Sequence, residues 1–286
     1  MNQATPSQDL FVSTAWLADH LGDADLRVFD ASWHMPATQR GGEAEYAQKH
    51  IAGAAFFDID AIADHESGLP HMLPRPEVFA KAMARMGFGD GMRAVVYDSL
   101  GLFSAARLWW MLRYFGVERV AVLDGGLPKW LAEGRAVEAG ATVVAERVFT
   151  PRPNPALVAS AAQVLRALET KSAQVVDVRA AERFRGAVPE PRPGLRAGHM
   201  PGAVNLPWNA LIEDGKMKDP AALPALLRGA GIDPDRPVIA SCGSGVSASI
   251  LSLALARCGR GAATVYDGSW SEWGAGDVYP VVQGEA

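Results

Sequence analysis

One of the two cysteines of this chain lies in the segment Pro237-Val238-Ile239-Ala240-Ser241-Cys242-Gly243-Ser244-Gly245-Val246-Ser247. The segment begins with an apolar run typical of a short buried strand, and the residues after it, 248–256, favour a helix. Cys242 therefore follows a strand directly, in a glycine-containing loop that leads into a helix. The amides of such a loop and the helix dipole favour a thiolate over a thiol. We predict a chemical role for Cys242, although lone cysteines more often only pack.

The chain contains a repeat with a long period. Three segments recur at a nearly constant offset: residues 28–31 and 175–178, 50–55 and 199–204, and 123–130 and 266–273. The last two segments end at Trp130 and Trp273, which are 143 residues apart. A period of this length indicates two copies of a whole domain, because solenoid repeats span only about 20–50 residues.

Each copy contains three short, almost continuously apolar runs. They are residues 26–30, 94–98 and 119–124 in the first copy, and 174–178, 237–241 and 263–267 in the second. Runs of this kind are typical of strands that are buried on both faces, as in a parallel sheet covered by helices. We predict an α/β fold of two tandem domains, each with a mainly parallel central sheet and helices on both faces.

A proline-rich stretch separates the two copies. Pro151, Pro153 and Pro155 lie within five residues of one another, and such spacing favours a stiff, extended chain. We place the first domain at residues 8–148, the linker at 149–156 and the second domain at 157–283.

The two copies differ at the loop that follows the central strand. The offset of 143 takes Cys242 to Ser99, in a loop with no thiol and with bulky Leu100, Leu102 and Phe103. We interpret the first domain as a non-catalytic copy. The active site should then lie between the domains, with the cysteine supplied by the second.

Charge and composition exclude several function classes. The net charge is −5 and the pI is about 5.7, which argues against nucleic acid as a partner. No apolar run approaches the length that spans a membrane, and residues 1–9 lack the basic start and apolar core of a secretory signal. Two cysteines are too few for a disulfide framework. We therefore expect a cytoplasmic protein.

The repeat and the Cys242 loop together resemble the tandem-domain rhodanese superfamily. The likeness covers about residues 10–275 and rests on the segments 29–33, 50–60, 71–74, 183–186, 198–202 and 267–273. One departure is Ser247, where the family usually has threonine, but both residues carry a hydroxyl. The resemblance implies an enzyme, with no cofactor or metal expected, in which Cys242 takes a sulfane sulfur and holds it as a persulfide. The sulfur then passes to a thiol, a thioredoxin-like protein or cyanide.

The resemblance also implies roles for the residues of the loop. Their amides would stabilise the thiolate and then the persulfide anion. The loop residues concerned are Gly243, Ser244, Gly245, Val246 and Ser247.

The same loop bears on the identity of the sulfur donor. Thiosulfate is a dianion, and relatives that use it place basic side chains in this loop, whereas Gly243 and Ser244 are neutral. A monocarboxylate such as 3-mercaptopyruvate needs only a nearby guanidinium. Arg183 and Arg192 match the family arginines that hold the carboxylate and carbonyl of that substrate. They could instead be solvated surface charges, Arg185 could replace Arg183, and thiosulfate stays open as the alternative donor.

A mercaptopyruvate donor brings a thiol proton that must be moved during transfer. Ser244, Asp60 and His71 match family residues of a proton relay that reaches across the domain interface, and such side chains can act as general acids and bases. For Asp60 and His71, a structural role in loop hydrogen bonding is an equal alternative. We assign His50 and His199, which occupy equivalent repeat positions, to the scaffold.

Other chemistries fit the sequence less well. A cysteine phosphatase requires an arginine to close its Cys-x5-Arg loop, and the chain has Ala248 there. A zinc-binding His-Glu-x-x-His helix would need histidine at Leu69, and no phosphate-binding Gly-x-x-x-x-Gly-Lys run occurs. A non-catalytic sulfur-carrier or interaction module stays open as an alternative, although the intact Cys242 argues against it.

Overall fold

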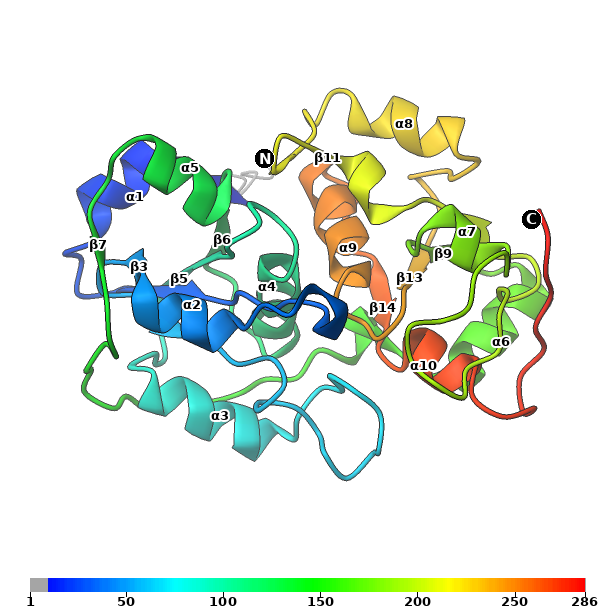
Figure 1. The fold of residues 1–286 in the computed structure, drawn as a ribbon, viewed down its shortest axis with the longest axis horizontal. Coiled ribbons are helices and arrows are strands. Elements are labelled where there is room, and N and C mark those ends of the chain that lie inside the picture. The colour runs from blue at the N-terminus through cyan, green and yellow to red at the C-terminus, as the bar shows by residue number, and fades with distance from the viewer. Residues whose placement is uncertain (1–9, 286) are drawn as a thin grey trace, which may run out of the picture.

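A parallel five-stranded sheet forms the centre of each half of the chain in the computed structural model, which describes residues 10–285 (Figure 1). The strand order in the first half is β1 (Phe11–Val12), β6 (Val120–Leu123), β5 (Arg93–Tyr97), β2 (Leu26–Asp30) and β4 (Ala55–Phe56). The order in the second half is β8 (Val158–Ala159), β14 (Thr264–Tyr266), β13 (Val238–Ser241), β9 (Gln174–Asp177) and β10 (Val204–Asn205). Neighbouring strands in both sheets run parallel. The two halves therefore share one topology, which confirms the predicted pair of α/β domains.

All six strands predicted from apolar runs are present, and they form the three inner strands of each sheet. The outer strands β1, β4, β8 and β10 have only two residues each, so they leave no periodic pattern in the sequence. Two small antiparallel pairs lie outside the sheets. They are β3 (His50–Ile51) with β7 (Val137–Glu138), and β11 (Ile212–Glu213) with β12 (Lys216–Met217).

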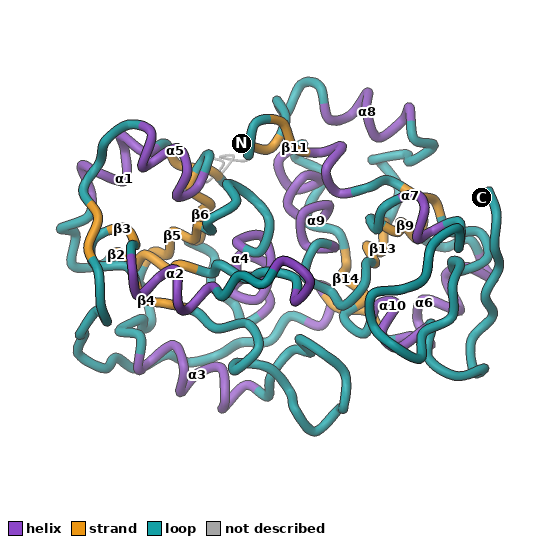
Figure 2. The backbone as a smooth tube through the Cα atoms, in the orientation of Figure 1, coloured by secondary structure: helices purple, strands orange, loops and turns teal. Residues whose placement is uncertain are grey.

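Helices cover both faces of each sheet, as predicted (Figure 2). The first half has α1 (Thr14–His20), α2 (Gly42–Gln48), α3 (Pro76–Arg85), α4 (Ala105–Tyr114) and α5 (Gly126–Ala132). The second half has α6 (Ala161–Thr170), α7 (Ala181–Phe184), α8 (Leu223–Gly229), α9 (Ala248–Arg257) and α10 (Ser269–Trp273). Local capping explains where some helices begin. In α6, Ser160 Oγ accepts from the Gln163 amide while Gln163 Oε1 accepts from the Ser160 amide, which is a capping box.

The two halves meet along α4 and α9, which lie side by side in the middle of the molecule (Figure 1). Residues 105–112 of α4 and 248–255 of α9 are all buried, because each helix packs against a sheet on one side and against the other helix on the opposite side. One hydrophobic core is therefore continuous across the halves, with Trp109 on one side and Leu251 on the other. A helix that is buried all round in this way is typical of the centre of a large core.

The predicted linker, residues 149–156, lies against the C-terminal end of α4. The amides of Arg152 and Asn154 donate to the carbonyls of Phe115 and Tyr114, at 2.9 and 2.7 Å. Residues 1–9, in which no secretory signal was expected, lie outside the described residues. A helix long and apolar enough to cross a membrane does not occur among residues 10–285.

Candidate active site

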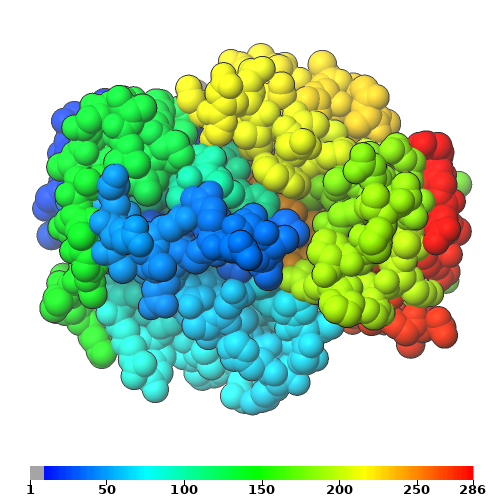
Figure 3. All heavy atoms as spheres, viewed as in Figure 1, coloured from blue at the N-terminus to red at the C-terminus, as the bar shows by residue number. Residues whose placement is uncertain are grey.

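Cys242 is the first residue after β13 and lies in the loop that leads into α9. Only 2% of the residue is exposed, and it lines a cavity of about 140 Å³. Trp33 and Phe103 line this cavity from the first half, and Arg192 lines it from the second. The space-filling view shows a narrow orange strip of the second half between blue and yellow-green segments (Figure 3). The cavity therefore lies between the two halves, where we expected the site.

The start of α10 holds the Cys242 loop in place. Ser269 Oγ accepts hydrogen bonds from the amides of Cys242 and Gly245, both at 3.1 Å, and it lies 4.0 Å from Cys242 Sγ. The Ser271 amide donates to the Gly243 carbonyl at 2.9 Å, and the Ser271 hydroxyl donates to the same oxygen at 2.7 Å. These contacts fix the backbone of the loop around the sulfur.

Sequence reasoning did not identify Ser269, although the repeat contains a signal for it. Ser269 has φ = +48°, in the left-handed region. Its counterpart at the offset of 143 is Gly126, with φ = +53°. A residue other than glycine costs about 1–2 kcal/mol in this conformation. The replacement of glycine by serine between the two copies therefore marks a position where the hydroxyl is needed.

Several amides around Cys242 have no acceptor within residues 10–285. They belong to Gly243, Ser244, Val246, Ser247 and Ala248. The first four of these residues also line the cavity. Unpaired amides at the start of a helix are ready donors for an anion.

The counterpart of Cys242 in the first half is Asp98, not Ser99 as the constant offset predicted. Asp98 directly follows β5, and Cys242 directly follows β13; these are the central strands of the two sheets. The last residue of β5 lies opposite the last residue of β2, and the last residue of β13 lies opposite the last residue of β9. The first loop is one residue longer than the second, because α4 begins seven residues after Asp98 and α9 six residues after Cys242. The offset of 143 comes from segments that follow these loops. It therefore places the counterpart of Cys242 one residue too late, at Ser99.

The Asp98 carboxylate is bound by the amides of its own loop. Phe103 and Ala105 donate to its Oδ2 atom at 2.7 and 2.8 Å. Burial raises the pKa of Asp98, and these amide hydrogen bonds oppose the shift. By their positions relative to the helix, the two donors correspond to Val246 and Ala248, which are free in the second half. The amides of Phe103 and Ala105 thus form an anion cradle, a set of backbone donors around one anion, which here is the Asp98 carboxylate. The second loop has equivalent amides beside Cys242.

Arg183 and Arg192 both reach the loop beside Cys242. A Cβ atom at Gly243 would lie 3.3 Å from Arg183 Nη2 and 3.8 Å from Arg192 Nη1. Burial lowers the pKa of Arg192, and the electrostatic interaction with Cys242 opposes this shift. The structure therefore places two guanidinium groups where a bound carboxylate could meet both.

Asp60 and His71 lie together at the edge of the site. His71 Nδ1 is 2.8 Å from Asp60 Oδ1, although the N–H direction is poor for a hydrogen bond. Trp33 Nε1 donates to Asp60 Oδ2 at 2.9 Å. The contact with His71 is the main influence that lowers the pKa of Asp60. On the other side of the ring, Arg192 Nη2 is 3.1 Å from His71 Nε2. Because arginine can only donate, this nitrogen accepts, and the ring proton lies on Nδ1, the nitrogen closer to Asp60.

Ser244 is buried and lines the cavity. Among the hydrogen bonds of the described chain, none joins it to His71 or to Asp60. The side chain that contacts the free nitrogen of His71 is Arg192. The structure thus brings Asp60, His71 and Arg192 together, and the part of Ser244 in a relay stays a prediction.

The remaining sequence candidates lie outside the cavity. Arg185, the alternative to Arg183, lies 3.7 Å from Glu285. His50 and His199 are buried, and their Nδ1 atoms contact backbone carbonyls at 2.8 and 2.9 Å. Cys258 is half-buried at the end of α9, where burial raises the pKa of its thiol. Within residues 10–285, no group of three or more His, Cys, Asp or Glu side chains could hold a metal ion.

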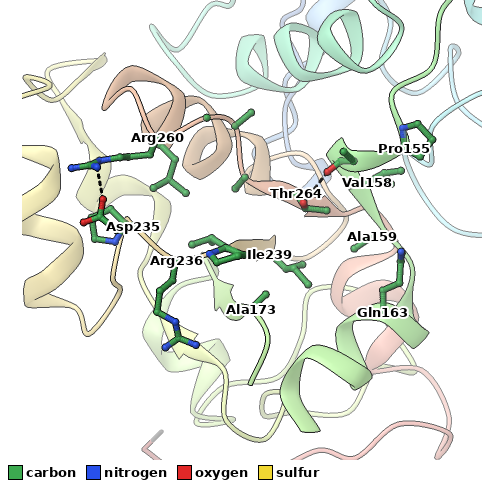
Figure 4. Close-up of a pocket in the computed structure, with 18 residues that line it drawn as sticks. Pro155, Val158, Ala159, Gln163, Ala173, Asp235, Arg236, Ile239, Arg260 and Thr264 are labelled. Atoms are coloured by element: carbon green, nitrogen blue, oxygen red, sulfur yellow. Dashed lines mark hydrogen bonds and ion pairs between the residues drawn. The ribbon is translucent and has the colours of Figure 1, made fainter. Parts of the chain in front are cut away.

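A larger cavity, of about 510 Å³, lies at the opposite end of the second sheet (Figure 4). It is lined by β8 and by the first residues of β13 and β14. Its polar side chains are already paired: Arg260 with Asp235, and Thr264 Oγ1 with the Ala156 carbonyl at 2.9 Å. Cys242 follows the other end of β13, so this cavity is separate from the site.

Comparison with known proteins matches both halves to one family model. Residues 13–133 and 160–275 each match the rhodanese-like domain. Each half of the chain is therefore similar to a domain of that kind.

The names of the full-length relatives refer to two different sulfur donors. The 3-mercaptopyruvate sulfurtransferase of Escherichia coli is 47% identical, over 95% of this chain and 97% of that protein. The thiosulfate sulfurtransferase of Rattus norvegicus is 42% identical, over 92% and 91%. Among solved structures, SseA, a 3-mercaptopyruvate sulfotransferase from Escherichia coli, matches with a TM-score of 0.85 and 45% identity, over 92% of this chain and 100% of that one. The choice between the two donors has to come from the site itself.

Proposed function

The chain belongs to the rhodanese family, and on that premise we propose that it is a 3-mercaptopyruvate sulfurtransferase. The Cys242 thiolate attacks the donor sulfur, an S–S bond forms, and the C–S bond of the donor breaks. The electron pair of the C–S bond stays on carbon as the enolate of pyruvate, which takes up the proton that the donor thiol gives up. The Cys242 persulfide then passes its outer sulfur to an acceptor.

The observation that carries this proposal is the anion cradle. In the first half, an Asp98 carboxylate oxygen is bound at 2.7 and 2.8 Å by two amides, and that oxygen is two bonds from Cβ. The outer sulfur of a persulfide on Cys242 would also be two bonds from Cβ. The free amides of Val246 and Ala248 can then stabilise the persulfide anion much as an oxyanion hole does. In this proposal residues 8–148 form the non-catalytic domain, and residues 157–283 carry Cys242.

The side chains around the cavity support 3-mercaptopyruvate as the donor. Gly243 and Ser244 add no charge to the loop, so the positive charge comes from Arg183 and Arg192, which lie beside it. Guanidinium groups bind a carboxylate through paired hydrogen bonds. We assign Arg183 and Arg192 to the carboxylate and carbonyl of the donor. A cavity of about 140 Å³ suits a donor of a few heavy atoms.

The neighbouring acid–base residues support handling of the thiol proton. His71 accepts from Arg192 at Nε2, so it carries its proton on Nδ1, which lies 2.8 Å from Asp60 Oδ1. If Arg192 turns toward the donor carboxylate, Nε2 becomes free to accept a proton. Ser244 completes the proposed relay from within the cavity.

The acceptor in this proposal is a small thiol, a thioredoxin-like protein or cyanide. A cytoplasmic location belongs to the same proposal, because both Cys242 and Cys258 are free thiols and a reducing compartment keeps thiols in that form.

The test compares two donors on the purified chain. Release of pyruvate from 3-mercaptopyruvate with a thiol acceptor should exceed transfer from thiosulfate to cyanide. A strong preference for thiosulfate would instead support the second candidate, a thiosulfate sulfurtransferase, which the similarity to the rat enzyme favours. Failure of Cys242 to gain a sulfur from either donor would support a non-catalytic module.

A further inference from the structure

A buried carboxylate lies next to the arginines of the site. The side chain of Glu190 is only 1% exposed. Its Oε2 atom pairs with Arg183 Nη2, and its Oε1 atom accepts from Arg183 Nε at 3.3 Å and from Arg179 Nη1 at 2.7 Å. Glu190 therefore contacts one edge of the Arg183 guanidinium, through Nε and Nη2.

The charge of Arg179 is already matched by another residue. Asp177 accepts from Arg179 Nε and Nη2, the latter at 2.7 Å, and both side chains are almost fully buried. Arg179 and Asp177 thus form a neutral pair. The negative charge of Glu190 therefore offsets the positive charge of Arg183.

The charges beside the donor cavity can then be counted. Arg183 and Arg192 contribute two positive charges, and Glu190 contributes one negative charge. Asp60 lies beyond the His71 ring with 61% of its side chain exposed, so water screens its effect on the cavity. Without the sulfur of Cys242, the cavity therefore presents one net positive charge.

We propose that Glu190 is a specificity-determining residue, which limits the positive charge of the cavity so that a monoanionic donor is preferred over a dianionic one. The proposal rests on the function proposed above, because it explains why a carboxylate donor suits this cavity better than thiosulfate. A carboxylate a few ångströms from a bound anion repels a second negative charge about as strongly as the first. A dianion therefore suffers about twice the repulsion that a monoanion does.

The experiment measures kcat/KM for 3-mercaptopyruvate and for thiosulfate, with the same acceptor, in the wild type and in Glu190→Gln. Glutamine keeps an oxygen for Arg179 but removes the charge. We expect the thiosulfate-to-mercaptopyruvate ratio to rise at least about tenfold. The matched control is Glu182→Gln, which removes the same charge from an exposed residue on α7 and should leave the ratio within about twofold. An unchanged ratio in Glu190→Gln would overturn the proposal.

A second variant tests the effect of charge without changing the buried contacts of Glu190. It also keeps the proposal testable if Glu190→Gln does not fold. Ala37 is exposed and lines the cavity from the first half. Ala37→Lys adds one positive charge without disturbing the arginines, and it should also shift the ratio toward thiosulfate. A ratio that does not move in Ala37→Lys would show that charge does not set the preference and would overturn the proposal.

A binding measurement distinguishes this proposal from the proposed function. In a Cys242→Ser background, which cannot turn over, titration calorimetry gives the Kd of pyruvate, a monoanion, and of thiosulfate, a dianion. Glu190→Gln should tighten thiosulfate binding at least about tenfold more than pyruvate binding. If that holds while the wild type transfers no sulfur from mercaptopyruvate, the proposed function fails and the role of Glu190 stands. If the wild type uses mercaptopyruvate but the Kd ratio does not change, the role of Glu190 fails alone.

Discussion

Arg107 and Asp267 form a buried ion pair across the two halves of the molecule, with Arg107 Nη1 at 2.6 Å from Asp267 Oδ1. Arg107 also donates to the carbonyls of His71 and Gly245, the latter at 3.4 Å. Asp267 Oδ2 accepts from the Leu73 amide at 2.6 Å. One ion pair therefore ties together α4, the segment that carries His71, and the Cys242 loop.

Loss of either member of this pair should destabilise the fold. Arg107→Met leaves a buried carboxylate without its cation, and Asp267→Asn leaves a buried guanidinium without its anion. Such changes cost about 3–5 kcal/mol, to be measured as the free energy of unfolding in urea. The double variant should lose clearly less than the sum of the two single losses. Strict additivity would show that the two residues do not act as a pair.

Replacement of the cysteine should abolish transfer and leave the fold intact. Cys242→Ser removes the only nucleophile in the cavity that can form a persulfide, so the protein should gain no sulfur atom after exposure to the donor. Mass spectrometry of the intact chain and circular dichroism provide the two measurements. Cys258→Ser is the matched control, since Cys258 lies away from the cavity, and it should keep both activity and mass gain. A sulfur found on the Cys242→Ser chain would remove Cys242 from the mechanism.

Arg192→Ala should weaken the use of mercaptopyruvate. A hydrogen bond to a charged group contributes about 1.5–3 kcal/mol, so we expect kcat/KM to fall roughly 10- to 100-fold. Because Arg192 also contacts His71, part of the loss should appear in kcat and not only in KM. Arg185→Ala removes a half-buried arginine at the end of α7, which lies outside the cavity, and should change neither constant. A similar loss in both variants would mean that bulk charge, and not contact with the donor, is responsible.

Asp60→Asn should affect the two donors differently. The contact with His71 keeps the pKa of Asp60 below its ordinary value, so the carboxylate is ionised throughout the neutral range. Mercaptopyruvate brings a thiol proton, whereas thiosulfate does not. Turnover of mercaptopyruvate should therefore fall by an order of magnitude or more, while transfer from thiosulfate to cyanide changes little. Equal losses with both donors would indicate a structural role for Asp60.

The inner strands and the cysteine loop could be predicted from the sequence because their signals are local. Strands buried on both faces give continuous apolar runs, and a cysteine between such a run and a helix is recognisable. The edge strands are too short to show a period. The residues that complete the site depend on partners far along the chain. Arg107 meets Asp267 across 160 residues, and nothing in the helix sequence separates it from a surface arginine.

The error at Ser99 has a physical cause. A repeat offset is constant only where the two copies have loops of equal length, and the first loop has one extra residue. The register of the central strands, which the sequence does not contain, shows that Asp98 is the counterpart of Cys242. The anion cradle could be recognised only after this correction.

Asp30 should make the wild-type protein less stable as the pH rises. Its carboxyl lies at the end of β2 with 1% of the residue exposed, and burial raises its pKa from 3.8 to about 6. The folded state therefore binds a proton that the unfolded state has lost between about pH 4 and pH 6, so stability falls as the pH rises through this range. Above it the ionised group costs about 2–3 kcal/mol. Asp30→Asn keeps an oxygen for the Ser32 amide, which donates to Asp30 at 2.9 Å, and removes the charge. In urea unfolding, the variant should be more stable than the wild type by about 2 kcal/mol near pH 8, and the difference should vanish near pH 4. A difference that is the same at both pH values would come from packing, and it would contradict the assignment of a raised pKa to Asp30.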